Sequence, residues 1–338
     1  MKLLVIGGSR FLGRAVVVEA LARGHEVTTF NRGVSHADVP GVEVVRGDRE
    51  VRADLDRLTA GRSWDAVVDT CGYVPRVVGE SVEALSGHAG TYAFVSSVSA
   101  VDGFPGKPAT EDKPGWPCAP DAGPDDGDYG VLKAGCERAV EQGFDGNALI
   151  VRPGLILGPY EEVGRLPWWL SRIARGGRVL APGDPDTPMQ LVDVRDVAIF
   201  TLDQAERGAS GTHVVTGPAG NATYGGWLGL CKEVTGSDAE FVWVENEFLV
   251  EQGAGLWVEL PLWGGPPSEE TANFWSVPTA EAQAAGLRTR PVAETVRDTW
   301  AWLREIPEEQ RVYGVKSTHG MAPEKEDAIL AAWAARSE

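Results

Sequence analysis

The sequence is short of positive charge and has no long apolar run. Among its 338 residues, 31 Lys and Arg stand against 49 Asp and Glu, which gives a formal net charge of −18. Nucleic acids and anionic membranes bind concentrated positive charge, so this balance argues against both as general partners. The apolar start at residues 1–6 is too short for a secretory signal, and no segment approaches transmembrane length. We therefore expect a cytoplasmic protein.

Cysteine and histidine are also scarce. The four cysteines lie far apart and form no C-x-x-C pair, so they indicate neither a disulfide framework nor a zinc site. The five histidines show no metal-ligand spacing, and we expect no metal. The chain length and its 43% hydrophobic content are sufficient for a large hydrophobic core.

Short apolar runs alternate with helical patterns over the first 160 residues. The predicted strands are Lys2–Ile6, Glu26–Phe30, Val42–Val45, Ala66–Asp69, Thr91–Val95 and Ala148–Val151. An amphipathic helix is predicted from Phe11 to Arg23, before the helix-stop residue Gly24. Strands that alternate with helices imply right-handed crossovers and a parallel sheet. The expected fold is α/β, a doubly wound parallel sheet of the Rossmann type with a smaller C-terminal lobe.

We expect two domains. Residues 1–160, together with about 186–218, form the predicted dinucleotide-binding domain, and about 161–185 with 219–338 form a substrate-binding lobe and the C-terminal helices. Residues 103–128 are rich in Pro, Gly and Asp and predict a long irregular loop, which in a compact domain is usually functional or mobile. Helices are predicted over Val292–Leu303 and, in the tail, over Ala322–Ser337.

A glycine-rich loop follows the first predicted strand directly. It reads Gly7-Gly8-Ser9-Arg10-Phe11-Leu12-Gly13 and opens a helix, an arrangement that surrounds a pyrophosphate with backbone N–H groups. Gly7 allows the tight turn and Gly13 the close packing of helix on strand. Arg10 replaces the usual middle glycine, so its side chain must turn away from the pyrophosphate or contact its charge.

The end of the second predicted strand bears on which dinucleotide binds. NAD-selective sites place a carboxylate there for the ribose hydroxyls, whereas NADP-selective sites place an arginine nearby. The sequence is Phe30-Asn31-Arg32-Gly33, without a carboxylate at the strand end. Arg32, with Arg10, can pair with a 2′-phosphate; a solvated loop position is the alternative for Arg32. We predict a preference for NADP(H), with NAD(H) as the alternative.

Two more segments follow strands at the same edge of the predicted sheet. Asp48, in Gly47-Asp48-Arg49, is placed either to accept from the adenine amino group or to cap a helix. Arg49 adjoins it as a further candidate. Thr70-Cys71-Gly72 is predicted to pass near the middle of the cofactor.

A tyrosine and a lysine stand four residues apart in Tyr129-Gly130-Val131-Leu132-Lys133. On a helix this spacing puts both on one face, and a cation near a phenol favours its ionised form. The fifth predicted strand ends in Val95-Ser96-Ser97-Val98-Ser99, where a serine hydroxyl can donate to a substrate oxygen while Tyr129 delivers the proton. Ser96, Ser97 and Ser99 are all candidates.

The chain resembles an extended short-chain dehydrogenase/reductase of the NAD-dependent epimerase/dehydratase superfamily. It is more closely similar to the bacterial isoflavone-reductase-like branch, which is related to chloroplast stem-loop RNA-binding proteins. The segments that carry the resemblance are GGSRFLG at 7–13, FNRG at 30–33, SSVS at 96–99, YGVLK at 129–133, RPGLILGP at 152–159 and LVDVRDVA at 191–198. The resemblance implies Ser97, Tyr129 and Lys133 as the catalytic triad, Pro153 at the cofactor, and a homodimer through a four-helix interface.

Two departures from the family pattern bear on the substrate. Gly154 and Leu155 follow Arg152-Pro153 where nucleotide-sugar enzymes have Asn, and Gln190 stands in the segment that often supplies an arginine for a sugar-nucleotide diphosphate. Arg178, Arg288 or Arg290 can compensate. The pocket is therefore predicted to take a small substrate that is aromatic or weakly charged. The candidate substrate contacts are Ser99, Trp168, Trp169, Gln190 and Trp257.

Three functions remain open at this point. The leading one is an NADP(H)-dependent oxidoreductase that transfers hydride between nicotinamide and a carbonyl or an activated double bond. The second is a nucleotide-sugar epimerase or dehydratase that holds NAD⁺ tightly. The third is a non-catalytic, dinucleotide-bound binding protein associated with RNA, against which the acidic charge and the complete Ser/Tyr/Lys set both argue.

Overall fold

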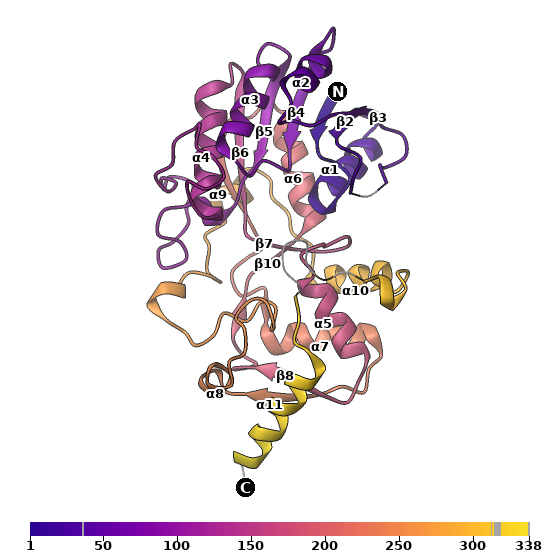
Figure 1. Cartoon of the computed structure of the whole chain (residues 1–338), viewed down its shortest axis with the longest axis vertical. Coiled ribbons are helices and arrows are strands. Elements are labelled where there is room, and N and C mark those ends of the chain that lie inside the picture. Colours follow the sequence, from indigo (N-terminus) through magenta and orange to yellow (C-terminus); the bar gives the residue numbers. More distant parts are fainter. Residues whose placement is uncertain (36, 312, 314–318, 337–338) are drawn as a thin grey trace.

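The structure is a computed structural model that describes residues 1–35, 37–311, 313 and 319–336. Its larger part is a sheet of seven parallel strands in the order β11-β6-β5-β4-β1-β2-β3, in the upper half of Figure 1. The strands are β1 (Lys2–Ile6), β2 (Glu26–Asn31), β3 (Glu43–Arg46), β4 (Trp64–Asp69), β5 (Ala89–Val95), β6 (Asn147–Pro153) and β11 (Gly211–Val215).

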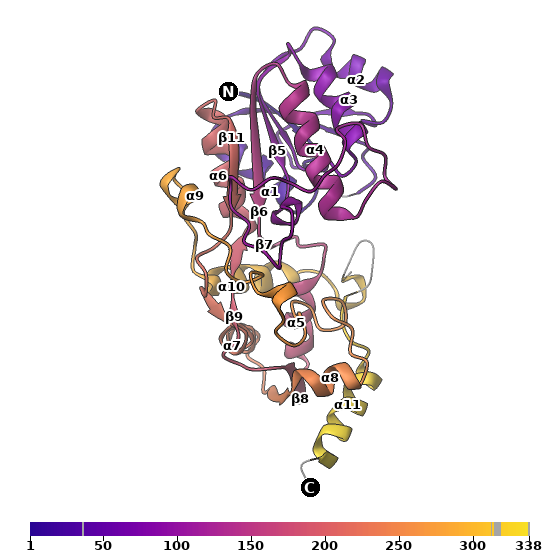
Figure 2. The same ribbon diagram turned by 90° about the vertical axis from the view of Figure 1, so that its left-hand side faces the viewer.

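Helices cover both faces of this sheet because successive strand residues point to opposite sides. In β1, Leu3 and Val5 enter one core, while Leu4 and Ile6 enter the other. Figure 2 shows α6 on one side of the sheet and α2, α3 and α4 on the other. The helices are α1 (Phe11–Ala22) and α6 (Val194–Glu206) for the first core, and α2 (Arg52–Thr59), α3 (Pro75–Leu85) and α4 (Tyr129–Gly143) for the second. The sheet is therefore doubly wound, which confirms the predicted fold class.

The smaller lobe has a core of its own, centred on buried indole rings such as Trp169 and Trp227. Its helices are α5 (Arg165–Ala174), α7 (Tyr224–Thr235), α8 (Asn246–Glu251), α10 (Val292–Leu303) and α11 (Pro323–Arg336). Its strands β8 (Arg178–Pro182) and β13 (Glu240–Val244) pair in parallel. Two further pairs lie outside the main sheet: β7 (Leu155–Leu157) with β10 (Leu191–Asp193), and β9 (Pro188–Met189) with β12 (Ala222–Thr223). Among the described residues, no helix is both long and apolar enough to cross a bilayer.

The observed elements differ from the sequence prediction in a few places. All six predicted strands are present with ends shifted by up to two residues, and β11 extends the sheet beyond them. The short helix α9 (Ala280–Ala284) returns to the sheet, where Ala282 and Leu287 join the core beside β1. Ser337, the predicted end of the tail helix, lies outside the described residues.

The 103–128 loop has no helix or long strand, but it is held firmly against α4. Arg138 donates from its two terminal nitrogens to the carbonyl oxygens of Gly115, Trp116 and Cys118, at 2.7–3.0 Å. Arg152 forms a buried pair with Glu137 and also donates to the carbonyl of Lys113. These hydrogen bonds therefore fix the position of the loop against α4.

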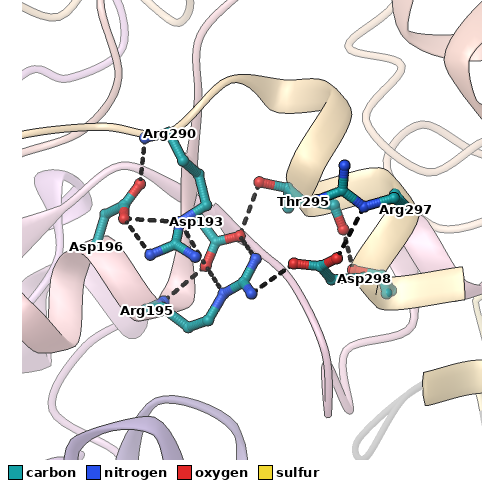
Figure 3. A network of polar contacts seen from close by, with 8 residues as sticks. Asp193, Arg195, Asp196, Arg290, Thr295, Arg297 and Asp298 are labelled. Atoms are coloured by element: carbon teal, nitrogen blue, oxygen red, sulfur yellow. Dashed lines mark hydrogen bonds and ion pairs between the residues drawn. The ribbon is translucent and has the colours of Figure 1, made fainter. Parts of the chain in front are cut away.

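A network of charged side chains around the buried Asp193 joins the two parts of the molecule (Figure 3). Asp193, the N-cap of α6, accepts from Arg195 at 2.8–2.9 Å and from the Thr295 hydroxyl of α10 at 2.7 Å. Arg195 also donates to Asp298 of α10 at 2.6 Å. Because these groups come from both domains, the network sets the position of the lobe relative to the sheet.

Candidate active site and dinucleotide site

Residues predicted to bind the cofactor or to take part in catalysis lie at the carboxyl edge of the sheet. The glycine loop follows β1, Thr70 and Cys71 follow β4, and Ser96 and Ser97 follow β5. In a parallel sheet these strand ends share one edge, which is where such folds bind their ligands. Tyr129 begins α4 directly after the 103–128 loop, so its side chain enters the same region.

The glycine loop fits a dinucleotide phosphate. Gly7 and Gly8 have φ angles of +106° and +89°, a region that L side chains rarely adopt. A Cβ on Gly7 would lie 2.9 Å from Thr70 Oγ1, and one on Gly13 would lie 2.7 Å from that atom and 2.9 Å from the Gly8 nitrogen. Only glycine allows strand, loop and helix to pack this closely. The same closeness opens the start of α1 to a ligand.

The other members of the loop have separate roles. Leu12 is buried in the core between α1 and the sheet, and Ser9 is buried as well, so both side chains support the loop from within. Phe11 is partly buried against the same core. Arg10 is the N-cap of α1, and its Nη1 donates to Glu162 at 2.7 Å. Arg10 therefore turns toward the segment between β7 and α5.

The ends of β2 and β3 carry two arginines and two carboxylates. Arg32 and Asp48 form an exposed pair with an N–O distance of 3.7 Å. Arg46 pairs with Asp38 and also donates to the side-chain oxygen of Asn31. The hydrogen bond from Arg46 is the first cause of the low pKa of Asp38. The sequence shows no carboxylate at the strand end, but the fold brings Asp38 back to Asn31, whose Nδ2 donates to it at 3.0 Å.

Arg49, a predicted cofactor contact, is bonded to other side chains of the protein. Its guanidinium donates to both oxygens of Asp69, at 2.9 and 2.8 Å, and to Ser81 at 3.1 Å. Cys71 also belongs to this buried group, because its backbone N–H donates to Asp69 at 3.1 Å. Burial raises the pKa of the Cys71 thiol. These contacts support the edge of the sheet from beneath.

Tyr129 lies on the solvent-exposed side of the site. Half of its surface is open to solvent, yet the protein atoms around the phenol displace enough water to raise its pKa. A side-chain contact with Ser97 and the charge of Arg165 act in the opposite direction. Gly130, next to Tyr129, has no room for a side chain, because a Cβ there would lie 2.3 Å from the carbonyl oxygen of Ser99. The first turn of α4 is thereby packed on the turn that follows β5.

Lys133 lies one turn further along α4 and is buried. Its Nζ donates to the carbonyl oxygens of Gly72 at 2.9 Å and Val95 at 2.6 Å. The ammonium is 4.2 Å from the centre of the Phe94 ring. Burial lowers the pKa of Lys133 to about 8. The fold thus holds a buried amine between the ends of β4 and β5.

The three serines after β5 differ in their burial and in their hydrogen bonds. Ser97 is nine-tenths buried, and its Oγ accepts from the backbone N–H of Ser99 at 3.1 Å. Ser96 Oγ is buried, and it has no hydrogen-bond partner within the described part of the chain. The backbone carbonyl oxygen of Ser99 accepts a hydrogen bond from Trp116 Nε1 at 3.1 Å. Ser97 is the serine whose side chain contacts Tyr129.

The predicted substrate contacts divide into two groups. Trp168 and Trp169 are buried in the lobe core, and Trp169 Nε1 donates to the carbonyl of Pro261 at 2.8 Å. Gln190 is also buried, with its amide bonded to the backbone of Gly217 and Val277. These side chains therefore support the fold. Trp257 is partly buried, with its ring centre 4.4 Å from that of Phe274 and 6.3 Å from that of Trp275.

Sequence reasoning missed several residues near the site. Tyr73 is half exposed, lies near Lys133, and has a pKa raised to about 12 chiefly by burial, with Tyr129 and Glu162 contributing. Arg165 opens α5 and is held by the fully buried carboxylate of Glu161 at 2.7 Å. Tyr73 directly follows the Thr70-Cys71-Gly72 segment in the sequence, and this position could have identified it as a candidate site residue. No local pattern marks Glu162 or Arg165 as part of the site.

Known proteins are similar to this chain in sequence and fold. A sequence profile of the NAD dependent epimerase/dehydratase family matches residues 3–217. The 2′-dehydrokanamycin reductase of Streptomyces kanamyceticus is 30% identical over 207 residues, so the match spans 58% of this chain and about half (55%) of that relative. A UDP-glucose 4-epimerase of Neisseria meningitidis serogroup B is 32% identical over 353 residues, with 90% of this chain and 98% of that protein covered.

A solved structure shows the same fold at lower identity. The UDP-glucose 4-epimerase of Thermus thermophilus, in complex with NAD, has a TM-score of 0.66 and 20% identity, with 91% of this chain and 100% of that chain covered. Membership of the isoflavone-reductase-like branch stays a prediction. The profile match and the full-length relative together show that the chain belongs to the NAD dependent epimerase/dehydratase family, whose members are enzymes of the short-chain dehydrogenase/reductase type.

Proposed function

We propose that this protein is an NADP(H)-dependent reductase of the extended short-chain type, acting on a carbonyl or an activated double bond. The observation that carries the proposal is the convergence of Ser97, Tyr129 and Lys133 at one strand edge, beside a glycine loop that fits a dinucleotide phosphate. Hydride chemistry is what a bound nicotinamide dinucleotide supplies. The remaining steps belong to side chains of this chain.

Tyr129 is the proposed proton donor. Its raised pKa keeps the phenol protonated at neutral pH, which is the form needed to protonate a carbonyl oxygen as negative charge develops on it. Ser97 contacts the phenol and orients the same oxygen by donating its hydroxyl proton in a hydrogen bond. Lys133 places a positive charge beneath the site and is the proposed support for the cofactor ribose and the tyrosinate.

The preference for NADP(H) is supported by the two arginines at the ends of β2 and β3. Arg32 and Arg46 stand beside Asn31, where the adenosine ribose is expected in this fold. Both are paired with carboxylates, so a 2′-phosphate must compete with Asp48 and Asp38 for them. A bidentate arginine contact to a phosphate of charge near −2 is the stronger pairing.

The proposed substrate is small and aromatic or weakly charged. The aromatic group of Trp257, Phe274 and Trp275 supplies apolar surface in the lobe. Gln190 has both its donor and its acceptor engaged by backbone groups, so it offers little to a diphosphate. The −18 net charge also disfavours an anionic substrate.

A nucleotide-sugar epimerase is the second candidate, and a specific observation favours it. UDP-glucose 4-epimerases align with 90% of this chain, whereas the reductase relative aligns with 58% of it. An epimerase oxidises and re-reduces one substrate, so it retains its NAD⁺ between turnovers. Retention of cofactor therefore separates the two candidates.

Native mass spectrometry tests this directly. The purified protein is measured as isolated, and again after addition of equimolar NADPH and NADH. A protein that is isolated empty and then retains NADPH selectively supports the exchangeable cofactor of a reductase. Tightly bound NAD⁺ on purification, or equal retention of NADH, contradicts the proposal and directs substrate screening toward nucleotide sugars.

A further inference from the structure

The segment of residues 158–164, between β7 and α5, contacts the first turns of α1 at two points. Arg10 Nη1 donates to Glu162 at 2.7 Å, although the two residues are 152 positions apart. One turn further along the helix, the Arg14 guanidinium lies over the Tyr160 ring, 4.5 Å from its centre. Gly158 and Gly164, at the two ends of the segment, have φ angles of +145° and +87°. The segment, which we call the strap, thus lies against the start of α1.

Two donors at the start of α1 have no acceptor among the described residues. The Nε atoms of Arg10 and Arg14 are both buried, and no described residue accepts a hydrogen bond from them. A buried N–H group without an acceptor is unfavourable, and such groups are rare in native proteins. Arg10 is the N-cap of α1 and Arg14 lies in its first turn, so both unpaired donors belong to the beginning of the helix. Together they indicate that an anion completes this end of α1.

Glu162 is the carboxylate that holds Arg10 in this arrangement. The side chains of the pair are 38% and 20% exposed, so the ion pair is partly open to solvent and exchangeable. A dinucleotide pyrophosphate at the glycine loop carries more negative charge than one carboxylate. It also offers several oxygens, enough for donors on both arginines.

We propose that Arg10 and Arg14 are pyrophosphate ligands and that Glu162 is a competing counter-ion, which gives up Arg10 when the dinucleotide binds. The inference rests on the proposed function, because it requires a dinucleotide at the glycine loop. Release of Glu162 removes one of the two contacts between the strap (residues 158–164) and α1, and this segment leads directly to Arg165, whose charge acts on Tyr129. Loading of the cofactor is thereby linked to Tyr129.

The test is a set of NADPH and NADH titrations by calorimetry on the full chain. Glu162→Gln removes the competing carboxylate and should tighten NADPH binding by about two- to fivefold, the range of a partly exposed ion pair. Arg10→Gln should weaken it by about tenfold, as for loss of a hydrogen bond to a charged group. In the Arg10→Gln background, Glu162→Gln should then have no effect.

Glu19→Gln is the matched control. Glu19 also pairs with an arginine that follows α1, Arg23 at 2.8 Å, but does so at the far end of the helix. This substitution removes the same charge and should leave the NADPH dissociation constant unchanged. Thermal unfolding of each variant shows whether it is folded.

The outcomes separate the two proposals. Wild-type protein that binds neither NADPH nor NADH overturns the proposed function, and the role of Glu162 with it. Wild-type binding with Glu162→Gln unchanged or weaker overturns the role of Glu162 alone. An equal gain from Glu162→Gln with or without Arg10 means general repulsion rather than competition for Arg10, and also overturns it.

Discussion

Arg49 and Asp69 form a two-pronged ion pair beneath the carboxyl edge of the sheet, with N–O distances of 2.9 and 2.8 Å. Their side chains are 10% and 0% exposed. Although burial acts to raise it, the pKa of Asp69 is held below its usual range by Arg49 and by the Tyr92 hydroxyl, which donates at 2.8 Å. The pair is therefore a structural support for the loops above it, and the Arg49 guanidinium is already engaged by a carboxylate.

Arg49→Leu is expected to lower the free energy of unfolding by about 3–5 kcal/mol, because it leaves the Asp69 carboxylate buried without its counter-ion. Urea denaturation measures this change. The double variant Arg49→Leu with Asp69→Leu should recover much of the loss. A folded, stable Arg49→Leu protein with weakened NADPH binding would instead return Arg49 to the cofactor site.

Tyr129→Phe is expected to abolish turnover and leave NADPH binding within about twofold, since only the hydroxyl that delivers the proton is removed. Steady-state kinetics and calorimetry provide the two measurements. Ser97→Ala should lower kcat by about 10²–10³-fold, as for other single donors to a developing oxyanion. Turnover by Tyr129→Phe at the wild-type rate would refute the assigned proton donor.

The activity should fall as pH rises through about 8, because burial lowers the pKa of Lys133 to that value and its charge is then lost. The pH profile of kcat/KM reports ionisations of the free enzyme and is the measurement. The free energy of unfolding changes in the opposite direction, because the folded lysine loses its proton near pH 8 whereas the unfolded one keeps it to a higher pH. As pH rises above 8, the folded state no longer carries the cost of burying a charged Lys133, and the protein becomes more stable.

Lys133→Arg is the control for this pH dependence, because a guanidinium stays charged throughout the accessible range. Whatever activity that variant retains should show no fall near pH 8. A fall that persists in Lys133→Arg would assign the ionisation to another group.

Asp38→Asn is expected to raise the preference for NADPH over NADH by about tenfold. Asp38 holds Arg46 in an ion pair and would repel a 2′-phosphate, so its removal frees one cation and deletes one like charge. The ratio of the two dissociation constants is measured by titration. Asp56→Asn, at an exposed pair with Arg52 on α2, is the control and should leave the ratio unchanged.

Thr295→Val tests the network between the domains. It removes the hydroxyl that donates to the buried Asp193 carboxylate at 2.7 Å, and should cost about 1–3 kcal/mol of unfolding free energy. Because the network positions α10 against α6, we also expect KM for substrate to rise while the NADPH dissociation constant stays unchanged. A weakened affinity for NADPH with an unchanged KM would place the effect in the first domain instead.

Much of the first domain could be predicted because its signals are local. The alternation of apolar runs with helical patterns locates β1 to β6, and Gly7 and Gly13 after β1 mark the tight glycine turn that opens α1. The spacing of Tyr129 and Lys133 places both on α4. Each of these inferences depends on residues within about one helix or one strand of each other, where propensity and periodicity decide the structure.

Pairings between distant segments were decided by the tertiary structure. Gln190 and Trp169 look like pocket residues in the sequence, yet their polar atoms bond to backbone groups in the interior. The return of α9 to the first core has no local signal either. Which side of a residue meets solvent, a ligand or another chain segment depends on what the fold packs against it.

The sequence by itself therefore determined the doubly wound sheet, its glycine loop and the spacing of Tyr129 and Lys133 on α4. Tertiary structure alone decided the partners of the charged residues: Arg49 with Asp69, Asp38 with Arg46, and Arg10 with Glu162. The physical reason is that an arginine or a carboxylate has no preferred partner along the chain. Its energy depends on the charge and the burial that folding brings to it.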